Sequence, residues 1–333
     1  MPILEQGYEP YKGTVKRGNR RFLSIAAAAL RRNRRWYVWI LLIMALLFGS
    51  GKETIFLLIA YVPTAFFGVD ASKIDAFIRA FADHPRFYTD MMSTQAFWAI
   101  VMGITVGAGE IAEDLRTGGL VFYLGRPVTR LDYLLGKTAS VSFVIVLVTL
   151  LPTLALYGTQ ALFEGEWSWL RDHWRVVPAA LAFTALLCVF VSGFVLGVSA
   201  IARRRLWATV SIAGCLFGMW TVAAVLAPPM AWTSHQEQRD FHAAVEAAKS
   251  REEMRKAWKD HADAYEDIGS GTPTAGWRAL SPTSSLAAVA RDLFGNPVPS
   301  NFRWGIQWIY VLGVPALFYG ILWRRIRAVE VVT

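Results

Sequence analysis

The stretch "EIAEDLRTGGLVFYLGRPVTRLDYLLGK" (residues 110–137) separates two apolar segments that each approach the length needed to cross a membrane. It contains acids, bases, paired glycines and an Arg-Pro step. Charged side chains are costly in hydrocarbon, so this connection must lie outside the bilayer core. The fold therefore depends on what flanks this stretch and on which side of a membrane it lies.

The composition of the whole chain indicates a membrane protein. Of its 333 residues 55% are hydrophobic and 18% are charged, and the mean hydropathy is +0.37. Lys and Arg together number 34 against 25 Asp and Glu. In a membrane chain such an excess is typical of loops held in the cytoplasm, whereas a nucleic-acid groove needs a solvated basic fold. We therefore expect membrane lipid as a partner and no nucleic acid.

Five membrane-spanning helices are predicted from apolar runs of about 20 residues. They cover residues 94–109, 138–157, 177–200, 206–227 and 304–323. Within the spanning cores so defined there is no Asp or Glu, and the nearest acid is Glu110 at a helix end. Carriers coupled to protons or ions usually need such groups, so their absence argues against a secondary transporter.

Residues 36–69 contain two apolar runs separated by "GSGKE", whose Lys52 and Glu53 would be costly at mid-bilayer. We expect a break or hairpin there, with one crossing made by either 36–50 or 54–69 and the other half lying in the interface or forming a tilted continuation. Basic clusters precede residue 36 and recur in 110–137, in "ARRR" (202–205) and in "WRRIR" (323–327). Placing all of them in the cytoplasm requires six spans with both termini inside, as in a multi-pass protein of the cytoplasmic (inner) membrane.

The chain is then expected to divide into four parts. Residues 1–35 form a cytoplasmic segment, in which "RRFLSIAAAALRRNRR" (20–35) predicts an amphipathic helix on the membrane surface. Residues 36–231 hold the first five spans, and 304–333 the last span and a cytoplasmic tail. Residues 232–303 form an outward helical region, in which "SPTSSLAAVARDLFG" (281–295) predicts an amphipathic helix that begins at Ser or Thr and ends at Gly295.

No catalytic or metal-binding motif is found. "FGSGKET" (48–54) resembles a phosphate loop, but Leu46 replaces its first glycine and Glu53 its hydroxyl residue. His235 and His242 share one predicted helix face, which supplies too few ligands for a metal. Cys188 and Cys215 lie in apolar runs. We expect no enzyme activity and no cofactor in this chain.

Two pairs of glycines lie four residues apart on predicted spans, Gly103 with Gly107 and Gly193 with Gly197. Small residues at this spacing allow close helix packing. The sequence leaves open whether the packing occurs within one chain or between two.

The connection 110–137 has an internal order of its own. "EIAEDLR" predicts a short helix with acids first and Arg116 later, ending at Gly118-Gly119, and Pro127 opens a second turn or helix. A short charged helix at the membrane face suits docking of a soluble partner. A plain basic loop would explain the arginines but not the acids, the glycines or the Arg-Pro.

The run from "GAGEIAEDLRTGG" to "LLGK" resembles the cytoplasmic coupling segment of type-2 ABC transporter permeases. The matching positions are Ile111, Glu113 with Asp114, Gly118, Leu120, Leu124, Arg126, Pro127, Thr129, Arg130, Tyr133, Gly136 and Lys137. The resemblance implies an all-α subunit with six spans that pairs with a second permease subunit and binds ATP-binding-cassette ATPases, which hold the ATP and Mg²⁺.

The resemblance also implies roles for residues. The ATPase interface would comprise Ile111, Glu113, Asp114, Arg116, Gly118, Arg126, Pro127, Arg130, Tyr133 and Lys137. Within this set the two acids and Arg116 would face the ATPase, while Arg126, Arg130 and Lys137 would fix the segment against it or against lipid phosphates.

The function expected from this resemblance is export driven by the partner's ATP hydrolysis. Residues 232–303 form a longer outward region than the short loop common in the family, and could bind an extracytoplasmic partner. Two alternatives remain: an ATP-independent carrier or channel with a polar path through Thr149, Thr153 and Tyr157, and an anchored scaffold that assembles through 232–301. No residue selects a substrate.

Overall fold

The computed structural model describes residues 21–61, 87–119, 129–164, 167–202, 204–226, 281–296 and 305–327. Every regular element in these ranges is a helix. Six segments are long and apolar enough to cross a membrane: Trp36–Ile55, Phe87–Arg116, Arg130–Leu162, Val176–Ile201, Arg205–Val222 and Ile306–Ile326. The chain is therefore an all-α membrane protein with six candidate spans, as the sequence predicted.

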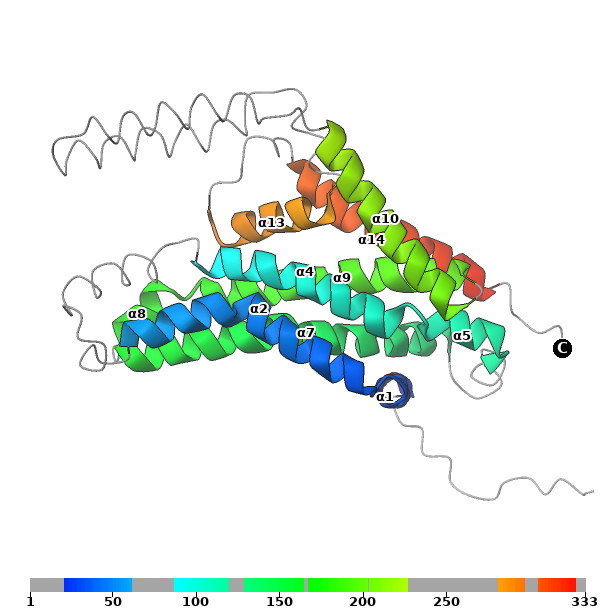
Figure 1. Ribbon diagram of the computed structural model, residues 1–333, viewed down its shortest axis with the longest axis horizontal. Helices are drawn as coiled ribbons and strands as arrows, with labels where there is room; N and C mark the ends of the chain where they lie inside the picture. The colour runs from blue at the N-terminus through cyan, green and yellow to red at the C-terminus, as the bar shows by residue number, and fades with distance from the viewer. Residues whose placement is uncertain are drawn as a thin grey trace, which may run out of the picture.

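Helix α1 (Arg21–Arg32) differs in direction from the spans. Figure 1 shows it end-on, crosswise to the bundle that runs horizontally through the view. Its apolar face, with Ile25, Ala26 and Ala29, is buried, and α1 packs on α7 (Arg130–Glu164). The contact is close, because a Cβ on Gly136 of α7 would stand 2.7 Å from the Ile25 Cβ. The predicted amphipathic helix is confirmed as a helix with one apolar face, and its place on the membrane surface stays a prediction.

Helix α2 (Trp36–Tyr61) is continuous through "GSGKE", so the expected break or hairpin there is wrong. Ser50 and Thr54 donate hydrogen bonds to carbonyls one turn earlier, at Leu46 and Ser50, as polar side chains do inside membrane helices. Among the described residues the candidate span is Trp36–Ile55, which covers the earlier half of the region. A continuous helix also leaves no loop for phosphate at 48–54.

Glu53 corrects the expectation that the spans lack carboxylates. It lies two residues before the end of the first candidate span, and its side chain is buried. One carboxylate oxygen lies 3.1 Å from the Lys52 ammonium, while Oε2 has no hydrogen-bond partner in the described part of the chain. Lys52 is itself exposed, which suits a long cation that reaches toward the membrane surface.

The core of the bundle is built by α4 (Phe87–Gly107), α7 and α9 (Val176–Ile201), and α14 (Ile306–Arg327) packs on α9. The four predicted packing glycines all lie at contacts within the chain. A Cβ on Gly103 or Gly107 would collide with Val191 or Val195 of α9, and a Cβ on Gly193 or Gly197 with Tyr319 or Phe318 of α14. Their packing is therefore intramolecular.

Helix α13 (Pro282–Leu293) is confirmed with Ser281 as its N-cap, Pro282 in its first turn and Gly295 in the left-handed region after its end. It packs on α4, α9 and α14 (Figure 1). Its first turn and the middle parts of α4 and α10 (Arg205–Leu226) line an apolar groove of about 400 Å³. This helix, expected in the outward region, therefore begins beside the middle of two spans. Residues 227–280, which precede this helix, lie outside the described residues.

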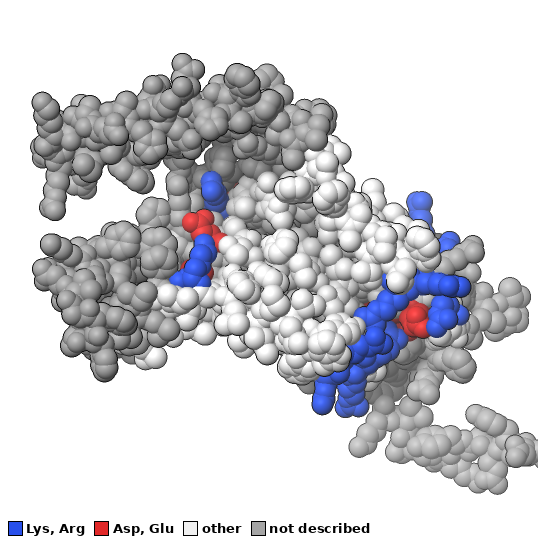
Figure 2. Space-filling view, in the orientation of Figure 1, with Lys and Arg blue, Asp and Glu red and all other residues white. Residues whose placement is uncertain are grey.

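The bundle has two chemically different ends. Helices α1, α5 (Glu110–Arg116) and the charged termini of α7, α10 and α14 share one end, here called the basic end. Figure 2 shows Lys and Arg side chains gathered there, with a mostly uncharged surface along the spans. The short helix α8 (Trp167–Asp172) lies at the opposite end (Figure 1). The segments that the sequence assigned to the cytoplasm thus lie together.

Candidate functional site

Helix α5 follows α4 after a two-residue turn and continues beyond the basic end of the spans (Figure 1). Its N-cap is Gly109, which has no side chain to bind the free N–H groups of the first turn. The hydroxyl of Ser199 on α9 accepts them instead, from Ile111 N at 3.2 Å and Ala112 N at 3.1 Å. This replacement cap fixes the start of α5 to α9.

The inner face of α5 presents two acids, Glu110 and Asp114, one helical turn apart, and both are buried. The ammonium of Lys137 on α7 lies 2.6 Å from a Glu110 oxygen and 2.8 Å from an Asp114 oxygen. The guanidinium of Arg32, the last residue of α1, lies 2.7 Å from Glu110 and 3.0 Å from Asp114. Two carboxylates and two cations thus join three helices; we call these four residues the charge cluster.

Two neutral side chains complete the charge cluster. The Tyr133 hydroxyl, one turn before Lys137, donates to Asp114 at 2.9 Å, and the Asn33 amide donates to Glu110 and to the Val106 carbonyl. Each carboxylate therefore accepts several charge-assisted or neutral bonds. Buried charges are tolerated only when they are paired and hydrogen-bonded in this way.

The charge cluster should be sensitive to the loss of any one member. Lys137 and Glu110 are each 1% exposed at the side chain, so water cannot take over a lost partner. Removing one side of such a buried pair costs about 3–5 kcal/mol, since the remaining charge stays buried and uncompensated. The pKa of Arg32 is raised: partial burial opposes its charge, but the Glu110 and Asp114 carboxylates outweigh that effect. Arg32 therefore remains charged near neutral pH.

The outer face of α5 carries a second, different ion pair. Arg116 donates to Glu113 at 2.6 Å, and both side chains reach solvent. Thr117 caps the C-terminal end of the helix and Gly118 follows with a φ of 70°, a conformation that suits glycine. Glu113, Arg116, Thr117 and Gly118 form what we call the exposed face of α5.

This division corrects two expectations. Asp114 was expected to face an ATPase, and Lys137 to bind the partner or lipid phosphates. Both side chains are instead buried and form an ion pair with each other, and Asp114 also pairs with Arg32. Ile111 and Tyr133 are also fully buried. The physical reason is helical spacing: positions 110, 111 and 114 lie on one side of α5, opposite 113 and 116.

The remaining predicted residues have separate roles or positions. Thr129 and Asp132 bond each other reciprocally as a capping box at the start of α7. Arg130, in the first turn of α7, is half-buried. Arg126 and Pro127 lie outside the described residues.

The sequence analysis did not assign four residues of this site: Arg32, Asn33, Glu110 and Ser199. Arg32 and Asn33 lie in a basic run that suggests only attraction to lipid, and Ser199 lies in an apolar span. A weak signal was present in the one-turn spacings of Glu110 with Asp114 and of Tyr133 with Lys137, which place each pair on one helix face.

Metal chemistry has no support in the described ranges, where no group of three or more His, Cys, Asp or Glu side chains converges. His235 and His242, considered above for a metal, lie outside the described residues.

Comparison with known proteins places this arrangement in a family. No curated protein matches the chain significantly. A family model described as "ABC-2 family transporter protein" matches residues 27–312, from the middle of α1 into α14 and across the whole charge cluster. The match covers most of the chain and agrees with the six candidate spans. The chain therefore belongs to the ABC-2 family of transporter proteins, as a transmembrane permease subunit.

Proposed function

We propose that this chain is the permease of an ABC exporter whose separate ATPase subunits dock on the exposed face of α5. Their ATP-driven movements would be carried by the charge cluster into α1 and α7. The chain itself would hydrolyse nothing, and ATP with Mg²⁺ would be bound by the partner. The supporting observation is that α5 is tied by buried ion pairs to two other helices, while Glu113 and Arg116 on its opposite face are solvent-accessible in the described part of the chain.

The basic end is assigned to the cytoplasm, where ATP is available. Basic residues of α1, α10 and α14 gather at that end in Figure 2, and the positive-inside rule favours such clusters on the cytoplasmic side. With six spans, both termini then lie in the cytoplasm. This orientation places α5 in reach of a soluble ATPase.

The contacts around α5 suggest how a displacement of this helix would be transmitted to the spans. Lys137 connects α5 to α7, and Ser199 connects it to α9. Helix α9 in turn packs on α14, where Phe194 and Phe318 meet edge to face with ring centroids 5.0 Å apart. Packed helices shift between discrete arrangements rather than deforming gradually, so a displaced α5 would move the spans as units.

Dimerisation and export are further parts of this proposal. Both rest on the family resemblance, since type-2 permeases act in pairs and move cargo outward. Residues 232–303 would supply a surface for an extracytoplasmic partner through the part that precedes α13.

The carrier alternative has less support. Thr149 and Thr153 both donate to carbonyls of their own helix, at Ile145 and Thr149. Their hydroxyl groups also contact Thr184 and Gln95 on neighbouring helices, so they serve helix packing. Glu53 and Asp90 lie in candidate spans and remove the argument that no intramembrane acid exists, but acids near the ends of two spans do not form a path.

The proposal is tested by inverting the exposed face of α5. The double variant Glu113→Lys with Arg116→Glu keeps the ion pair and the helix but reverses the charge pattern that a partner meets. We expect the ATPase to be lost from the purified complex while the yield of folded permease is unchanged.

The matched control is Arg324→Glu with Arg325→Glu, two exposed residues at the same end on α14. It should retain the ATPase. Retention of a stoichiometric ATPase by the α5 variant would overturn the docking assignment.

A further inference from the structure

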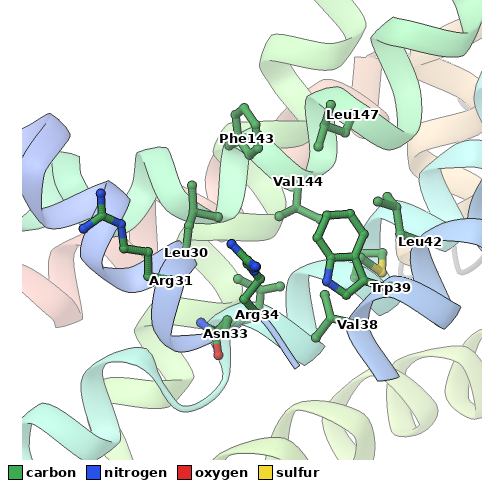
Figure 3. A pocket seen from close by; sticks show the side chains of 12 residues that line it. Leu30, Arg31, Asn33, Arg34, Val38, Trp39, Leu42, Phe143, Val144 and Leu147 are labelled. Carbon is green, nitrogen blue, oxygen red and sulfur yellow. The ribbon is translucent and has the colours of Figure 1, made fainter. Parts of the chain in front are cut away.

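An apolar groove of about 210 Å³ opens where α1 turns into α2, at the basic end (Figure 3). Its walls are Leu30 of α1, Val38 and Leu42 of α2, Val106 of α4, and Val144 and Leu147 of α7. Four helices thus contribute to one hydrocarbon-lined space. Trp39 and Phe143 stand at its edges and are both about half exposed, at 52%.

Two arginines, Arg31 and Arg34, lie at this groove. Figure 3 shows the Arg34 side chain beside Leu30 and Val144, with Arg31 on the α1 side. Both are exposed. No ion pair or hydrogen bond joins either guanidinium to the part of the chain that the structure describes.

The neighbouring residues of the same basic run behave differently. Arg32 is bound by Glu110 and Asp114, and Asn33 by Glu110 and the Val106 carbonyl. Within the run "RRNRR" (31–35), Arg32 therefore pairs with the acids of α5 and Asn33 donates a hydrogen bond to Glu110, while Arg31 and Arg34 lie beside an apolar groove. This pairing of exposed cations with hydrocarbon lining suits a ligand that is anionic at one end and apolar at the other.

We propose that this groove binds an anionic phospholipid of the leaflet at the basic end. One acyl chain enters between α2, α4 and α7, and the phosphate lies on Arg31 and Arg34. The groove holds only part of one chain, so the rest of the lipid stays in the bilayer. Guanidinium groups suit phosphate because their N–H donors match its oxygens in pairs.

The location agrees with this occupant. Helix α1 lies crosswise to the spans, as a helix at the membrane surface does, and α2 begins at Trp36 with a second tryptophan at 39. Aromatic residues of this kind concentrate at headgroup level, and basic pockets between spans bind anionic headgroups there. A soluble phosphate compound would use the arginines but not the lining.

The test is lipid binding by native mass spectrometry of the full chain in detergent, with added phosphatidylglycerol or phosphatidylcholine. We expect phosphatidylglycerol to bind more tightly. In the variant Arg31→Gln with Arg34→Gln its affinity should fall roughly thirtyfold, as expected for two basic residues facing an anionic lipid. Both positions are exposed, so the variant should fold.

Controls separate this site from general charge attraction. Arg324→Gln with Arg325→Gln removes the same charge at the same end of the bundle and should leave the affinity unchanged. Leu42→Trp, which fills the groove but keeps both arginines, should also weaken phosphatidylglycerol binding.

Three results would overturn the proposal: equal loss in the Arg324 and Arg325 control, no loss in either groove variant, or displacement of the lipid by inorganic phosphate alone. The last would show that the arginines bind a headgroup without the apolar groove.

Discussion

The two ends of the helix bundle hold their helices together by different chemistry. At the basic end, α1, α5 and α7 meet through the four charges of the charge cluster. At the opposite end, α4, α7, α8 and α9 meet through apolar and aromatic side chains: Phe87, Tyr88, Met91, Leu156, Tyr157, Trp169 and Val176. Its described hydrogen bonds between helices are neutral, such as that from Tyr88 to Gln160 at 2.7 Å.

This difference bears on mechanism. A buried ion pair fails sharply when its geometry is lost, because each charge needs its partner. Apolar and aromatic contacts tolerate sliding, since they are weakly directional. The basic end is therefore suited to carry a displacement from one helix to the next, and the opposite end to accommodate it.

The largest effect is expected for Lys137→Met, which leaves Arg32 as the one cation that contacts Glu110 and Asp114 among the described residues. We expect a loss of about 3–5 kcal/mol of stability, because the uncompensated carboxylate is buried. The measurement is the thermal midpoint of detergent-solubilised protein, followed by size-exclusion chromatography.

A second variant distinguishes charge from packing. Lys137→Met combined with Asp114→Asn restores the charge balance and should recover much of the loss. If the double variant were no more stable than Lys137→Met alone, the stabilisation would come from the volume of the lysine chain and not from its charge.

An intermediate effect is expected at the helix contacts between the two ends. Gly193→Val should cost about 1–3 kcal/mol by overpacking, because its Cβ would stand 2.7 Å from the Tyr319 ring and 2.9 Å from the Pro315 Cβ. Gly214→Val on α10 is the control, since nothing lies within 4 Å of its Cβ position. Equal shifts of the thermal midpoint in both would show that helix propensity, not close packing, sets the cost.

A smaller effect is expected for Tyr88→Phe at the opposite end. It removes the hydrogen bond to Gln160, and such bonds between membrane helices contribute about 0.6 kcal/mol on average. The thermal midpoint should fall by much less than in Lys137→Met. A loss as large as that of Lys137→Met would remove the proposed contrast between the two ends.

The smallest effect on stability is expected for Glu113→Lys with Arg116→Glu, the variant that should release the ATPase. Arg116 is exposed, and the inverted pair can re-form on the same helix. Its thermal midpoint should match that of the unmodified chain. A fall comparable to that of Gly193→Val would mean that release of the ATPase reflects unfolding.

The spans were predictable because hydropathy alone decides them. Five runs were found, three of them within five residues of both ends, while the runs 94–109 and 138–157 fall up to eight residues short of their spans. The crosswise helix α1 followed from its apolar stripe between arginines. The continuity of α2 was not predictable from the cost of charge, because Lys52 and Glu53 lie near the end of the span, where the cation reaches the surface and pairs with the acid.

The site was predicted as a segment but not as an arrangement. The short helix, its glycine end and its charges followed from residues 110–119. Which acid turns inward depends on the side chains that pack against α5. Arg32 and Lys137 are 78 and 27 residues from their partner Glu110 in the sequence. Ser199 is 88 residues from Ile111. Contacts over such separations leave no local pattern in one sequence.

Cross-linking from Thr117 tests the central claim most directly, because this residue ends the exposed face of α5. In a chain with Cys188→Ala and Cys215→Ala, Thr117→Cys and Thr159→Cys place single reactive thiols at the basic and opposite ends. After cross-linking in native membranes and mass spectrometry, Thr117→Cys is expected to give an adduct with an ATP-binding-cassette ATPase and Thr159→Cys none. An ATPase adduct from Thr159→Cys, or none from Thr117→Cys in a complex that still contains the ATPase, would contradict the account.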